Sequence, residues 1–283
     1  MTCGRLSSRS PVDSALMRIS LLCSVAIVLS VPRVSLGADE VTPLPRAHAH
    51  NDYLHPRPLL DALQHGFCSV EADVFLVDGR LLVAHTKSEL SRDRTFEGLY
   101  LKPLQDRIRA NDGRVYKDGP VFRLLIDIKS SGRATWSELN RVLAEYADLF
   151  SRVEDGEFHE SAVTAVISGN RPFTTVEETS PRYAGIDGRV SNFGDDFPAH
   201  LMPLISDNWN RHFRWRGEGE FPEAERQKLQ QMVDTAHKEG RLIRFWASPD
   251  TPEAWEVLHT SGADLINTDN LSGLSTWLRA QSQ

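Results

Sequence analysis

Residues 46–85 read RAHAHNDYLHPRPLLDALQHGFCSVEADVFLVDGRLLVAH, and this stretch carries the strongest evidence for the fold. It holds two pairs of polar residues whose members are two positions apart: His48 with His50, and Glu71 with Asp73. On a β-strand, this spacing points both side chains of a pair to the same face. His85 ends the stretch. Two acids on one strand face, with histidines at the ends of neighbouring strands, are typical of a divalent-cation site beside acid–base catalysts.

Strand-like and helix-like runs alternate after residue 38. Hydrophobic patterning predicts strands over 46–51, 68–77, 80–85, 121–129, 162–168, 242–247 and 264–268, with two short candidates at 183–186 and 202–205, of which the sheet could need only one. Helices are predicted over 57–65, 101–110, 136–150, 222–239, 252–261 and 271–278. This alternation favours one α/β domain, a (β/α)₈ TIM-type barrel, over a doubly wound sheet. Asp78-Gly79 reads as a hairpin turn, which departs from strict strand–helix alternation.

The N-terminus has the layout of a secretory signal peptide. Arginines precede an apolar run over 19–31, and small residues stand before Ala38. The run is too short for a spanning helix, so we expect residues 1–37 to be a signal peptide and 38–283 the folded domain. The alternative is a retained membrane anchor. A signal peptide predicts export to the periplasm or the extracellular space.

The chain is acidic, with a formal net charge of −7 and no basic runs. This balance argues against nucleic acid as the partner, but a bound cation would still permit a phosphate substrate. Cys68 is the only cysteine after residue 38, so no intramolecular disulfide is expected there. Its place in a strand-like run predicts a small core residue.

The active site of such a barrel lies at the carboxyl ends of the strands, where the polar residues gather. Glu71, Asp73 and Asp127 offer three oxygen ligands and no thiolate, which suits Mg²⁺ or Ca²⁺ better than Zn²⁺. His50 and His85 then fit a general acid and a general base. The plainer alternatives are that His85 is a surface residue and that the acids form salt bridges.

Three more residues are expected to bind the substrate. Lys129 follows Asp127 by two positions, so it either neutralises a phosphoryl group or pairs with Asp127. Asn51 and Trp246 stand at the ends of predicted strands and are expected to contact the substrate. The segment 207–220 is predicted to form a loop over the barrel mouth, where its aromatic residues either touch the substrate or fill the loop core: Trp209, Phe213 and Trp215.

The stretch from 47 to 85, with its HAHNDY and SVEADV strings, resembles the glycerophosphodiester phosphodiesterase and phosphatidylinositol-phospholipase-C-like superfamily. The likeness is strongest to the altered inheritance of mitochondria protein 6 group. LLIDIKS at 124–130 and INTDNLSG at 266–273 are similar to further strand ends of that superfamily.

The resemblance implies a TIM-type barrel and a metal-dependent phosphodiesterase. His50 and His85 match the two catalytic histidines, while Glu71, Asp73 and Asp127 match the metal ligands. Lys129 matches the basic residue after the last ligand.

The chain also departs from typical glycerophosphodiesterases, which have His-Arg-Gly where it has His50-Asn51-Asp52 and often His-Asp where it has His85-Thr86. They use glutamate where it has Asp127. These departures leave the substrate open. We expect a small-molecule or lipid phosphodiester, acted on by a monomer that contacts membranes at most peripherally.

Two other classes of protein fit parts of the pattern. An amidohydrolase-type barrel would use His48 and His50 as zinc ligands with Asp269, but the later strands lack the histidines it needs. A barrel that binds a lipid or sugar headgroup without catalysis would carry the same residues with no turnover.

Overall fold

The computed structural model describes residues 41–281. All of them belong to one compact unit, Asp39–Gln283. The predicted signal peptide at 1–37 lies outside the described residues. Among the helices that are described, none has the length and apolar character needed to cross a bilayer.

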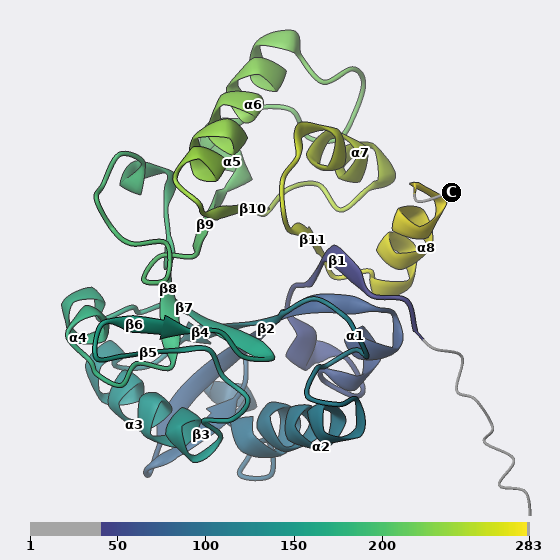
Figure 1. Ribbon diagram of the computed structural model, residues 1–283. Helices are drawn as coiled ribbons and strands as arrows, with labels where there is room; N and C mark the ends of the chain where they lie inside the picture. Colours follow the sequence, from purple (N-terminus) through teal and green to yellow (C-terminus); the bar gives the residue numbers. More distant parts are fainter. Residues whose placement is uncertain (1–40, 282–283) are drawn as a thin grey trace, which may run out of the picture. The chain divides into compact units, whose positions relative to one another are not determined.

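Eight parallel strands form a nearly closed barrel (Figure 1). They are β1 (Leu44–Ala49), β2 (Phe67–Val77), β4 (Phe122–Ile128), β7 (Val163–Gly169), β8 (Ala184–Gly188), β9 (Leu204–Asn208), β10 (Leu242–Trp246) and β11 (Ile266–Thr268). They are hydrogen-bonded in the order β10-β9-β8-β7-β4-β2-β1-β11, and a parallel bridge between Arg244 and Leu265 joins the two ends. The predicted TIM-type barrel is therefore confirmed.

Helices follow the strands and lie around the outside of the ring (Figure 1). They are α1 (Leu60–Gln64), α2 (Lys102–Ala110), α3 (Gly132–Glu145), α4 (Phe173–Glu177), α5 (Trp209–His212), α6 (Glu223–Lys238), α7 (Pro252–Ser261) and α8 (Leu271–Gln281). The ends of α7 show how local sequence sets these bounds. The Thr251 side chain accepts a hydrogen bond from the Ala254 amide, Pro252 occupies the first turn, and Gly262 follows with a φ of +85°.

The hairpin was predicted correctly, but the barrel strand after it was not. Asp78 and Gly79 have φ angles of 48° and 73°, which suit a tight turn. The strand that follows, β3 (Arg80–Val83), pairs antiparallel with the end of β2 and stands outside the ring. Hydrophobic alternation cannot give the direction of pairing, and the third strand of the barrel is β4. Both short candidates, β8 and β9, join the ring.

The remaining elements are short and were not predicted as such. They are η1 (Asp52–Leu54), η2 (Lys87–Glu89), the π-helical turn η3 (Glu97–Leu101), η4 (Val190–Asn192) and the hairpin of β5 (Arg152–Glu154) with β6 (Glu157–His159). The aromatic side chains of segment 207–220 are buried: Trp209, Phe213 and Trp215 pack with Phe221. These side chains therefore fill the core of the loop, which was one of the two predicted alternatives, and do not line the pocket. Cys68 is fully buried, as expected.

Candidate active site

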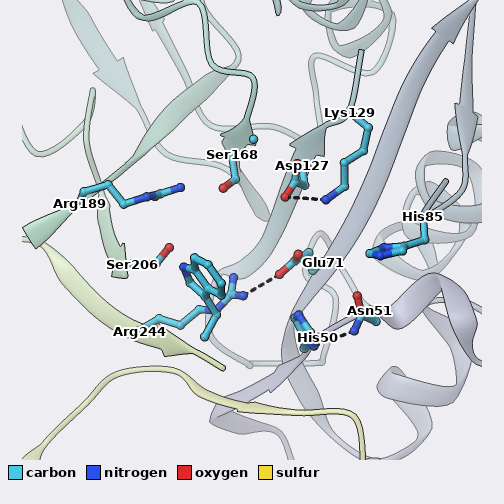
Figure 2. Close-up of a pocket in the computed structure, with 12 residues that line it drawn as sticks. His50, Asn51, Glu71, His85, Asp127, Lys129, Ser168, Arg189, Ser206 and Arg244 are labelled. Atoms are coloured by element: carbon cyan, nitrogen blue, oxygen red, sulfur yellow. Dashed lines mark hydrogen bonds and ion pairs between the residues drawn. The ribbon is translucent and has the colours of Figure 1, made fainter. Parts of the chain in front are cut away.

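A pocket of about 300 Å³ opens where the carboxyl ends of the barrel strands meet. Figure 2 shows side chains from opposite sides of the ring pointing into it. The lining residues are His50, Asn51, Glu71, His85, Asp127, Lys129, Ser168, Gly169, Arg189, Ser206, Arg244 and Trp246. Seven of the eight predicted site residues line the pocket. The eighth, Asp73, is buried beside Lys129.

The three predicted metal ligands meet on neighbouring strands. Asp73 on β2 stands directly opposite Asp127 on β4 in the strand register, and Glu71 lies two residues before Asp73 on the same face. One oxygen from each of the three carboxylates lies within 4.8 Å of the others. They form the only group of this kind among the residues that the structure describes.

Two oxygens of this cluster have no hydrogen-bond partner although they are buried: Asp73 Oδ1 and Asp127 Oδ1. Lys129 Nζ satisfies the other oxygen of each acid, at 3.1 Å from both. Burial raises the pKa of Asp73 to about 6, an effect that the Lys129 charge opposes and the Asp127 charge reinforces. Buried carboxylate oxygens without a donor are costly, and a divalent cation would satisfy them.

Backbone geometry keeps this space open. Gly169 ends β7 with a φ of +68°, and a Cβ at this position would lie 2.0 Å from Asp127 Oδ1. Any other residue would therefore displace Asp127. The donor set, the orphaned oxygens and the clearance at Gly169 all fit a hard divalent cation.

Glu71 is held by a buried network that the sequence did not reveal. Arg244 Nη2 donates to Glu71 Oε2 at 2.7 Å, and Arg244 Nε donates to Asn267 Oδ1 at 2.9 Å. Burial opposes ionisation of Glu71, but the Arg244 charge, the hydrogen bond to His48 and the nearby histidine charges together outweigh it and lower the pKa of Glu71 below its usual range. His48, fully buried, lies behind Glu71 at 3.5 Å and bonds Ser69 through Nδ1. Burial lowers the pKa of His48 to about 3, so the ring is neutral.

His50 is oriented by an acid from the other end of the chain. Its Nδ1 lies 2.8 Å from Asp269 Oδ1. Asn51 Nδ2 lies 2.8 Å from the same Nδ1 and 3.3 Å from Asp269 Oδ1. A carboxylate only accepts, so in the tautomer with its proton on Nδ1 the ring donates to Asp269 and leaves Nε2 available for proton transfer. Asn51 has a φ of 48°, a left-handed conformation that asparagine tolerates well.

His85 follows β3 and is oriented by Tyr53 and Asp73. Its Nδ1 lies 2.9 Å from the Tyr53 hydroxyl and 3.1 Å from Asp73 Oδ2. The same hydroxyl lies 2.7 Å from Asn51 Oδ1, so it links both predicted histidine regions. Tyr53 is buried and its ring stacks near parallel to that of His85.

Sequence reasoning missed Tyr53, which lies between the two histidine regions, and considered Asp269 only as a ligand of an amidohydrolase. It also missed four residues on other strands or loops of the ring: Ser168, Arg189, Ser206 and Arg244. Asp269 had a signal, since it follows the last strand directly. Arg244 had one as well, as a cation inside an apolar strand. Nothing in the local pattern distinguished the two serines.

The nearly closed barrel, the carboxylate cluster and the flanking histidines define the class of protein: a TIM-type barrel with a candidate metal site at the carboxyl ends of its strands. A model of the AIM6-like phosphodiesterase domain matches residues 37–186. That match covers more than half of the chain, and the protein belongs to this family. The matched segment includes both histidines and all three acids. It ends before Arg189, Ser206, Arg244 and Asp269.

Relatives of this family extend along most of the chain. The altered inheritance of mitochondria protein 6 of Eremothecium gossypii is 30% identical over 272 residues, covering 83% of this chain and 70% of that protein. The homolog from Arthroderma benhamiae is 25% identical over 262 residues, covering 82% and 83%. The crystal structure of a glycerophosphodiester phosphodiesterase from Agrobacterium tumefaciens aligns with a TM-score of 0.51 and 15% identity, over 84% of this chain and 100% of that one. That likeness shows a shared fold.

Proposed function

We propose that the protein hydrolyses a phosphodiester in a reaction that depends on a divalent cation, with His50 and His85 as the general acid and base. One observation carries the proposal. A cluster of three carboxylates with two buried, unpartnered oxygens lies in the same pocket as two histidines whose Nδ1 atoms are each fixed by a carboxylate. In the described part of the chain, neither histidine has a partner at Nε2. Each ring can therefore exchange a proton with a ligand through that atom.

Glu71, Asp73 and Asp127 are the residues that would hold the cation, either Mg²⁺ or Ca²⁺. When bound, it would polarise the phosphoryl oxygens of the substrate. Lys129 and Arg244 already balance part of the carboxylate charge. The pocket therefore combines negative ligands for a cation with positive side chains for a phosphate.

The chain's own residues supply the proton transfers. One histidine takes the proton from the attacking hydroxyl, and the other gives a proton to the leaving alcohol. Asp269 and Tyr53 hold the two rings so that each keeps its proton on Nδ1. Where the substrate carries a hydroxyl next to the phosphate, that hydroxyl would attack first and give a cyclic phosphate.

The substrate we propose is a lipid-derived or glycerol-type phosphodiester, encountered after export by a monomeric enzyme. The family match to a phosphodiesterase domain and the fold shared with a glycerophosphodiester phosphodiesterase support the reaction class. An amidohydrolase is less well supported. His48 is enclosed by Ser69 and Glu71, and the carboxylate cluster contains no histidine.

The test is hydrolysis of glycerophosphodiesters, phosphoinositides, sphingomyelin and lysophospholipids, with and without chelator. We expect chelator to abolish turnover, and His50→Ala and His85→Ala each to reduce it about 10²–10⁴-fold. His159→Ala is the control because that side chain is exposed on β6, outside the pocket. Full turnover in both pocket variants would refute the assignment, as would turnover that resists chelation. Binding without turnover on any substrate would favour a headgroup-binding barrel.

A further inference from the structure

The wall of the pocket formed by Ser168, Ser206 and Arg189 has a fixed hydrogen-bonding polarity. The Ser168 hydroxyl donates to Asp187 Oδ2 at 2.8 Å, and the Ser206 hydroxyl donates to the same oxygen at 2.7 Å. Asp187 is 1% exposed and lies behind the wall. A carboxylate oxygen only accepts, and a serine hydroxyl has a single proton. Both serine oxygens that line the pocket can therefore accept a hydrogen bond from a ligand but cannot donate one.

Arg189 supplies donors beside these two acceptors. Its Nη1 donates to Asp187 Oδ2 at 2.7 Å and to the Gly188 carbonyl oxygen at 2.7 Å, which locks the side chain in place. Within residues 41–281, its Nε and Nη2 groups have no hydrogen-bond partner. Figure 2 shows the Arg189 side chain extending toward the pocket between the two serines.

Two guanidinium groups lie at the wall: Arg189 pairs with the Asp187 carboxylate, and Arg171 donates to the backbone oxygen of Asp187. The part of the Arg189 guanidinium that points toward the pocket would oppose a cationic headgroup. A quaternary ammonium such as choline also has no N–H to give, so it would leave both serine oxygens without a donor.

An anion does not match the wall either. A second phosphate or a carboxylate would pair with Arg189, but it would bring acceptor oxygens against the acceptor-only oxygens of Ser168 and Ser206. A hydroxyl group fits both halves of the wall, because it donates to a serine oxygen and accepts from the guanidinium. Two acceptors beside Arg189 call for more than one hydroxyl on the ligand.

We propose that this wall is a specificity subsite that selects phosphodiesters of a polyhydroxylated alcohol over those of choline. The inference rests on the proposed function, since the phosphate of such a ligand must occupy the carboxylate side of the pocket. Arg189 and Ser206 lie beyond the segment matched by the family model, so the match does not assign this wall.

The experiment compares two ligands that share a phosphate and differ in the alcohol. Calorimetric titration of the full chain, with Mg²⁺ present, measures the affinities of myo-inositol 1-phosphate and phosphocholine. We expect the inositol phosphate to bind about 10-fold more tightly, which is the effect of one to two net hydrogen bonds. The double variant Ser168→Ala/Ser206→Ala should bring that ratio close to one, because it loses the hydrogen bonds to the inositol hydroxyls and no longer presents unpaired serine oxygens to choline.

Ser275→Ala is the matched control. Ser275 is a buried serine on α8 whose hydroxyl bonds His65 and the Ser272 carbonyl oxygen, outside the pocket, so its loss should leave the affinity ratio unchanged. If the double variant also loses phosphocholine, its fold has changed, and the two single variants replace it, each expected to lower the ratio about 3-fold. A wild-type ratio at or below one would overturn the subsite while leaving the proposed function intact, as would a ratio that the serine variants do not move. If neither phosphate binds the wild-type protein, the proposed function fails, and the subsite fails with it.

Discussion

The Tyr53 hydroxyl lies 2.9 Å from Nδ1 of His85. It also lies 2.8 Å from Asp73 Oδ2, so one phenol joins a predicted metal ligand to a predicted catalytic histidine. The phenol is buried, and the proximity of Asp73 with its negative charge adds to burial in raising the pKa of Tyr53 well above its usual value. Tyr53 therefore stays protonated, donates to an acid, and can accept the Nδ1 proton of His85. This arrangement makes it a positioning residue.

Tyr53→Phe should lower the rate of phosphodiester hydrolysis about 10-fold with little change in KM, a typical effect of losing an outer hydrogen bond. Asp73 Oδ2, at 3.1 Å, would then be the one remaining partner of His85 Nδ1 among the described residues, so the share of rings with the proton on Nε2 should rise. Nitrogen-15 NMR of His85 reports the tautomer directly, without any need for turnover. Tyr100→Phe is the control, because its hydroxyl bonds Asp52 and lies outside the pocket. An unchanged tautomer in Tyr53→Phe would contradict the positioning role.

Gly169→Ala should abolish the stabilisation of the protein by Mg²⁺ or Ca²⁺. A Cβ at Gly169 meets Asp127 Oδ1 at 2.0 Å, so Asp127 must leave the cluster. Gly156→Ala is a matched control, because Gly156 also has a positive φ, at +81°, but no atom lies within 4 Å of its Cβ position. Both variants carry the cost of a positive φ, about 1–2 kcal/mol. Gly169→Ala also crowds the backbone oxygen of Ile128 at 2.5 Å, and only this variant should lose the cation response. Thermal unfolding with and without cation measures this, and an equal response in both variants would argue against the site.

Arg244→Met should lower the free energy of unfolding by about 3 kcal/mol without cation, because it leaves the buried Glu71 carboxylate unpaired. Urea denaturation measures the loss. Saturating Mg²⁺ should restore part of it, since the cation supplies the missing positive charge. Arg141→Met is the control, because it breaks only exposed ion pairs and should leave the stability close to that of the wild type. If Arg244→Met is as stable as the wild type, the ion pair between Arg244 and Glu71 contributes nothing to the free energy of unfolding.

Asp52 predicts a pH dependence of stability. Burial raises its pKa from 3.8 to about 7, against the hydrogen bonds from the Leu59 amide and the Tyr100 hydroxyl. Between these pH values the folded protein holds a proton that the unfolded chain has released. The contribution is therefore fully present below pH 3.8 and is lost as the pH rises through about 7.

Asp52→Asn removes this titration. The free energy of unfolding of the wild type, relative to the variant, should fall by roughly 4 kcal/mol between pH 4 and pH 8. Urea denaturation of both proteins across this range gives the difference. A difference that does not vary with pH would show that Asp52 has the same pKa in the folded and unfolded states.

The sequence by itself determined what depends on short spacing. Two positions between Glu71 and Asp73 place both on one strand face, and Asp78-Gly79 allows only a tight turn. The alternation of strands and helices was enough to predict the barrel, because consecutive parallel strands need a crossover, usually a helix, that brings the chain back to the start of the next strand. It could not show that β3 leaves the ring, since a strand with the same alternation can pair in either direction.

Only the tertiary structure decided which distant residues share the pocket. Asp269 reaches His50 because β11 pairs with β1, and Arg244 reaches Glu71 across the barrel interior. Ring closure and strand register are properties of the whole sheet, so no local pattern encodes these contacts. The same holds for Ser168 and Ser206, whose polarity is set by Asp187 on the strand between them. Spacing along the chain therefore predicted the carboxylates, and closure of the barrel determined what faces them.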